Sequence, residues 1–132
     1  MTRIFNFKIL STLPALATIF LALTPAAYAH HSFAMYDNSK ELVLDGVVRL
    51  FRWTNPHGGI MLTVIERGKS VEYAIELSSP NVMSRQGWNR NSLRTGERVR
   101  ITIHPLKDGT KGGSFMRAVK ANGTVLGPTA PP

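Results

Sequence analysis

Apolar and polar residues alternate along most of this chain, and a helical pattern interrupts the alternation once. Successive side chains of a strand point to opposite faces, so the alternating segments are expected to form half-buried strands. Between them, Ser79 can cap a helix, Pro80 suits its first turn and Gly87 can end it, which predicts a short helix from Pro80 to Gln86. The predicted strands cover Glu41–Trp53, Ile60–Glu66, Ser70–Leu77, Arg98–His104 and Phe115–Lys120.

The order of these elements indicates one fold class. The first strand is long and is expected to bend at Gly46, and a glycine-containing turn joins the next two strands into a hairpin. Three strands, one helix and two further strands follow the element order of an OB barrel. We therefore predict an all-β fold, a five-stranded OB-like barrel over residues 30–126, with the short helix between its third and fourth strands. Residues 124–126 can pair back after the Asn122-Gly123 turn, and residues 127–132 are predicted to form a disordered tail.

The first 29 residues have the three parts of a secretory signal peptide. Basic residues without an acid open the chain, and the apolar run Ile9–Leu23 follows, with Pro14 inside it. The small residues of Ala27-Tyr28-Ala29 then match the rule for signal peptidase cleavage. A stable membrane span needs about 18 or more apolar residues, so we expect cleavage after Ala29 rather than an uncleaved anchor. The mature chain is predicted to start at His30 in the periplasm, with no membrane span after signal cleavage.

The composition of the mature chain restricts its chemistry. From residue 30 onward the chain has the size of one small domain. It contains no cysteine, which excludes disulfides, iron–sulfur clusters, zinc–thiolate sites and cysteine nucleophiles. Fourteen basic residues remain after Arg3 and Lys8 are removed with the signal, against eight acidic residues, so the mature net charge is about +6 with neutral histidines. A basic balance of this size is typical of a solvated basic face, and it bears on solubility and non-specific binding rather than on a particular ligand.

Five short motifs are spread over nearly the whole mature chain: His30-His31-Ser32, Trp53-Thr54-Asn55-Pro56-His57, Glu76-Leu77-Ser78-Ser79-Pro80-Asn81, Arg85-Gln86-Gly87-Trp88 and Ser92-Leu93-Arg94-Thr95-Gly96. In these motifs the chain resembles a family of small exported bacterial proteins that is classed as a domain of unknown function. The resemblance implies a periplasmic protein with an OB-like fold. It implies no activity, because none is assigned to that family.

Three histidines are the candidate metal ligands: His30, His31 and His57. A terminal His30 would offer its free amine and its imidazole from one residue, and His31 would add a second ring. His57 follows Pro56, which restricts the backbone of the turn. The ordinary pKa is about 8 for a terminal amine and about 6.5 for an imidazole. At neutral pH both groups can therefore lose their protons to bind a metal at a small cost in free energy. Nitrogen sites of this kind favour copper(II) among the first-row divalent ions, so the sequence predicts copper as the cofactor.

Five arginines within sixteen residues leave a second function open: Arg85, Arg90, Arg94, Arg98 and Arg100. Such a cluster can bind a polyanion through its charge and through bidentate hydrogen bonds. The alternative prediction is therefore an interaction or polyanion-binding OB-like module that uses this basic surface. Its partner would be a periplasmic protein or another anion, since nucleic acid is not expected in that compartment.

The sequence offers no catalytic motif. Ser78 and Ser79 lack the glycines of a nucleophile elbow. Glu72 and Glu76 lie four residues apart on one predicted strand, roughly 13 Å from each other, which is too far for a catalytic carboxylate pair. We therefore expect a binding protein rather than an enzyme, with a copper-dependent redox enzyme as a third alternative.

Overall fold

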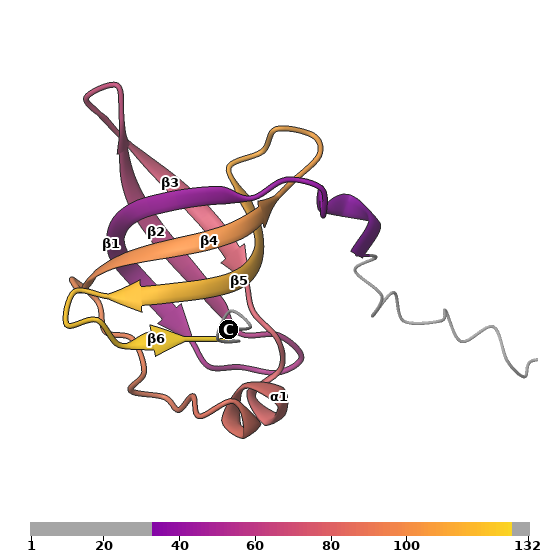
Figure 1. Cartoon of the computed structure of the whole chain (residues 1–132), viewed down its shortest axis with the longest axis vertical. Coiled ribbons are helices and arrows are strands. Elements are labelled where there is room, and N and C mark those ends of the chain that lie inside the picture. The colour runs from indigo at the N-terminus through magenta and orange to yellow at the C-terminus, as the bar shows by residue number, and fades with distance from the viewer. Residues whose placement is uncertain (1–32, 128–132) are drawn as a thin grey trace, which may run out of the picture. The chain divides into compact units, whose positions relative to one another are not determined.

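The structure is a computed structural model that describes residues 33–127, and its strands form a closed barrel (Figure 1). Its elements are η1 (Phe33–Met35), β1 (Leu42–Arg52), β2 (Gly59–Glu66), β3 (Lys69–Glu76), α1 (Pro80–Arg85), β4 (Arg98–Pro105), β5 (Gly112–Lys120) and β6 (Val125–Leu126). The predicted OB-like barrel with one short helix is confirmed. No helix between residues 33 and 127 is long and apolar enough to cross a membrane. The predicted signal peptide and most of the predicted tail lie outside the described residues.

The strand order explains how the barrel closes. Neighbouring strands follow the order β3-β2-β1-β4-β5-β6, and β3 pairs in addition with β5. This last pairing is parallel and joins residues 74–76 to residues 112–114, whereas the others are antiparallel. It covers edges of β3 and β5 that would otherwise present unpaired backbone groups. The result is the strand arrangement of an OB barrel.

Strand β1 belongs to both halves of the barrel. Its residues 42–47 pair with β4, and its residues 46–52 pair with β2. Gly46 lies at the changeover, where an added Cβ would stand 2.6 Å from the carbonyl oxygen of Thr63. The close approach of β2 therefore explains the glycine. The irregularity in pairing lies slightly further along, between Val48 and Leu50.

Strand β5 begins three residues before the predicted start at Phe115. Gly112 and Gly113 have no side chains, so they carry no alternation that a sequence reading can detect. An added Cβ at Gly112 would collide with the carbonyl oxygen of Ala74, and one at Gly113 with that of His104. The two glycines therefore allow β3, β4 and β5 to approach closely where the barrel closes.

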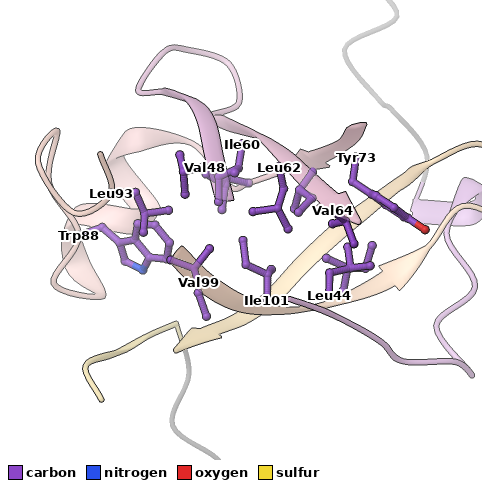
Figure 2. Packing of buried hydrophobic residues seen from close by; sticks show 14 of the residues in the cluster. Leu44, Val48, Ile60, Leu62, Val64, Tyr73, Trp88, Leu93, Val99 and Ile101 are labelled. Atoms are coloured by element: carbon purple, nitrogen blue, oxygen red, sulfur yellow. The ribbon is translucent and has the colours of Figure 1, made fainter. Parts of the chain in front are cut away.

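Apolar side chains from β1 to β5 fill the barrel (Figure 2). Val48, Leu62 and Ile101 in its interior have no exposed surface. Trp88 and Leu93, which follow α1, lie at one end of this cluster, and Tyr73 lies at the other end with its hydroxyl directed outward (Figure 2). Helix α1 begins as predicted, because Ser79 caps it by accepting a hydrogen bond from the amide of Val82 at 3.5 Å; it ends at Arg85, one residue early. The core thus reaches past the strands into the segment after α1.

Candidate functional site

The loop between β1 and β2 presents His57, and its backbone is hydrogen-bonded to the residues that follow β3. Thr54 Oγ1 donates a hydrogen bond to the carbonyl of His57 at 3.3 Å. The next residue, Gly58, donates its amide to Ser78 and accepts a bond from the amide of Leu77, both at 3.1 Å. Gly58 is buried, and a Cβ there would lie 2.8 Å from a side chain of α1. OB barrels commonly bind ligands with this loop, so His57 occupies a suitable position.

The imidazole of His57 contacts a carboxylate through one ring nitrogen, and the side chain remains partly exposed to solvent. Its Nδ1 contacts Oε1 of Glu76, the last residue of β3. Glu76 is brought there by the pairing of β3 with β2, which sets it opposite Gly59. An ionised carboxylate only accepts hydrogen bonds, so Nδ1 carries the proton and, in the neutral ring, Nε2 carries the lone pair. The side chain of His57 is 41% exposed, so a ligand can approach it from solvent.

Tyr36 occupies the second oxygen of the same carboxylate. Its hydroxyl donates a hydrogen bond of 2.6 Å to Glu76 Oε2, and its side chain is buried. Burial and then the Glu76 carboxylate raise the pKa of Tyr36, so the phenol stays protonated as a donor. The backbone around it is anchored as well, since Tyr36 bridges to Leu106 and the Lys107 amide donates to Met35 at 3.0 Å. The chain therefore enters the barrel beside the His57–Glu76 pair.

Among the three predicted metal ligands, the structure describes only His57. His30 and His31 lie outside the described residues. Within residues 33–127 no three side chains of His, Cys, Asp or Glu gather as a metal site would require. His104 lies on β4 and its Nδ1 bonds the carbonyl of Lys40 at 2.8 Å. A metal at His57 would therefore need ligands from outside this part of the chain.

The five predicted arginines lie in different parts of the fold. Arg85 ends α1, and Arg90 and Arg94 belong to the segment between α1 and β4. Only Arg98 and Arg100, on β4, line a groove of about 870 Å³ on the outer face of the sheet. Two basic residues of β5, Arg117 and Lys120, line the same groove.

Sequence reasoning assigned no role in a site to four residues: Glu76 and Tyr36 beside His57, and Arg117 and Lys120 in the groove. Glu76 has a detectable signal, because it is an acid on the polar side of an apolar strand. The other three have none, since their positions depend on which strands pair and in which register.

A protein-family model matches most of the chain. Residues 18–116 match the model of a protein family described as a family of unknown function, DUF6152. The matched range includes the three candidate histidines, Glu76 and Tyr36, and it ends within β5, before Arg117. No curated protein and no solved structure matches the chain significantly.

Proposed function

Because the chain belongs to the DUF6152 family, a family of unknown function, we propose from its own residues that it is a periplasmic binding protein that holds copper(II) with His57 and a mature amino terminus at His30. The observation that carries this proposal is the bond between His57 Nδ1 and Glu76. Histidines that bind metals typically donate their other ring nitrogen to a carboxylate, which fixes the tautomer, orients the ring and raises its basicity. His57 has this arrangement, with Nε2 as the ligating atom.

The position of Tyr36 supports a contribution from the amino terminus. Tyr36 and His57 bind the same carboxylate, so the chain passes close to the imidazole at residue 36. His30 precedes Tyr36 by six residues, and three of these, Phe33–Met35, form the 3-10 helix η1. The proposal requires a terminus at His30 to reach His57. Its amine and imidazole would complete a three-nitrogen site, and the ring of His31 would be a further donor.

Copper(II) is the ion that this donor set favours. Nitrogen ligands bind copper(II) more strongly than the other divalent ions of the first row, and the set contains no thiolate, the donor of many structural zinc sites. We place binding ahead of catalysis, because a copper redox enzyme would need in addition an open coordination position that faces a substrate.

Copper titration of terminal and loop variants tests this function. The complete chain is expressed and exported, and the purified protein is sequenced from its amino terminus, with His30 expected first. Electron paramagnetic resonance of the copper(II) complex should show nitrogen ligands. Replacing both terminal rings in His30→Ser/His31→Ser should weaken binding by more than about tenfold, because the amine then has no adjacent imidazole with which to form a chelate. His57→Gln should also weaken it by about tenfold or more, because it removes one ligand although the chelate remains.

The control is His104→Gln, because the His104 ring bonds a backbone carbonyl elsewhere on the barrel. It should leave copper affinity unchanged. A first residue other than His30 in the parent, or equal copper affinity in His30→Ser/His31→Ser, would contradict the proposal.

A second candidate function is the binding of an anionic partner by the basic surface, and one observation favours it. Arg98 and Arg100 of the predicted cluster share the outer groove with Arg117 and Lys120. A heparin fragment is a suitable probe, because it carries dense negative charge and no apolar side chains. Its binding should weaken as the salt concentration rises.

A further inference from the structure

The outer groove crosses four strands, from β2 over β1 and β4 to β5. Its apolar lining includes Val47, Ile65 and Val119, and its basic lining consists of Arg98, Arg100, Arg117 and Lys120. The typical OB ligand face lies on the second and third strands. This groove shares β2 with that face but extends in the other direction, across β1 and β4 to β5.

The charges in the groove are unevenly compensated. Asp45 is its only acidic lining residue, and Arg100 binds both carboxylate oxygens of Asp45, at 2.8 and 2.9 Å. Lys120 contacts Glu97 at 2.9 Å. Arg98 and Arg117 form no ion pair with any residue between 33 and 127. Two guanidinium groups are therefore available to carboxylates of a partner.

Apolar side chains line part of the groove, so a ligand that carries only charged groups would leave them uncovered. Ile65 is 66% exposed, and Val47 and Val119 are half-buried. Protein interfaces typically combine an apolar centre with a polar rim, and arginine is enriched in them. Three strand spacings separate β2 from β5, about 14 Å, which is the length of about four extended residues.

We propose that this groove binds an extended acidic peptide segment of a partner protein, whose carboxylates pair with Arg98 and Arg117 and whose apolar side chains cover Val47, Ile65 and Val119. The proposal rests on the second candidate function and names its partner. It is independent of copper.

Selection of random 12-residue peptides against the purified protein tests this inference. The enriched peptides should combine Asp or Glu with apolar residues. Their affinity should fall at least tenfold in Arg98→Glu/Arg117→Glu and at least threefold in Ile65→Ser. The matched control, Arg85→Glu/Arg90→Glu, makes the same charge change outside the groove and should alter affinity less than twofold. Urea unfolding of each variant verifies that it is folded.

A heparin fragment and vesicles of phosphatidylglycerol serve as competing probes. If no acidic and apolar peptides are enriched, or if those enriched bind the groove variants equally well, the inference is overturned. Heparin binding that needs Arg98 and Arg117 would then preserve the second candidate function without a peptide partner. Tighter binding of vesicles than of any peptide would also overturn it, in favour of a lipid surface.

Discussion

At the scale of single residues, Glu76 should determine how well His57 binds a metal. Loss of a carboxylate behind a ligating histidine typically costs about 10- to 100-fold in metal affinity. Glu76→Gln keeps the size of the side chain and a hydrogen-bond acceptor but removes the charge. We therefore expect copper(II) binding to weaken at least about tenfold, measured by titration against a competing chelator.

Glu72→Gln is the matched control for this prediction. Glu72 lies four residues earlier on the same strand, 43% exposed, and pairs with Arg49 at 2.7 Å. The same chemical change there should leave copper affinity unchanged. Equal losses in both variants would mean that general surface charge, rather than the bond to His57, affects the metal.

Sequence reasoning could find His57 but not its surroundings. A histidine after a proline in a turn is visible in the sequence, because residue type and local pattern are enough to single it out. The contact with Glu76 depends on the register of β2 with β3, and the contact with Tyr36 on a bridge to Leu106, seventy residues further along the chain. Neither can be obtained from local patterns. The groove around Arg98 and Arg100 could not be predicted from local patterns either. Its other basic residues, Arg117 and Lys120, come from β5, which pairs with β4 only in the folded barrel.

At the scale of elements, the segment after α1 closes one end of the barrel, and Trp88 is its main contribution. The ring is 3% exposed and packs edge-on against Phe115, with centroids 5.2 Å apart, and at a tilt against Phe51 at 6.1 Å. Trp88→Ala should therefore lower the free energy of unfolding by about 3 kcal/mol or more, measured by urea denaturation. Leu50→Ala, at an exposed leucine of β1, should cost less than about 0.5 kcal/mol. A similarly small loss for Trp88→Ala would show that the ring does not support the core.

The elements themselves were largely predictable, and the errors have a common cause. Alternation located β1 to β4 within a few residues, and the cap at Ser79 located the start of α1. Alternation requires side chains, however, so it missed the start of β5 at Gly112 and Gly113. The parallel contact of β3 with β5 lies at these glycines. The element order predicted the closed barrel. Gly112 and Gly113, which permit its closure, could not be located because they add nothing to the alternation of apolar and polar residues.

Across the whole barrel, the carboxylates of Glu66 and Asp45 form hydrogen bonds with side chains from other segments of the chain. Glu66 on β2 accepts from the hydroxyl of Tyr73 on β3, and from Lys111, before β5, at 2.9 Å. These hydrogen bonds, that of Tyr73 first, hold the pKa of Glu66 below its usual 4.5. The hydrogen bonds from Arg100 likewise lower the pKa of Asp45. Protonation of such groups in acid therefore removes contacts between strands.

The sign of the pH dependence follows from these lowered pKa values. A group with a lower pKa in the folded than in the unfolded chain stabilises the fold fully above its unfolded pKa, and this stabilisation is lost as the pH falls through the folded pKa. Urea denaturation should therefore show decreasing stability as the pH falls from about 5 to 3. Glu66→Gln should reduce stability at pH 7 and make this decrease shallower, so that variant and parent converge in acid. Glu41→Gln, at a side chain that forms no hydrogen bond or ion pair with residues 33–127, should run parallel to the parent. Parallel curves for Glu66→Gln and the parent would mean that its bonds to Tyr73 and Lys111 do not contribute to the stability of the barrel.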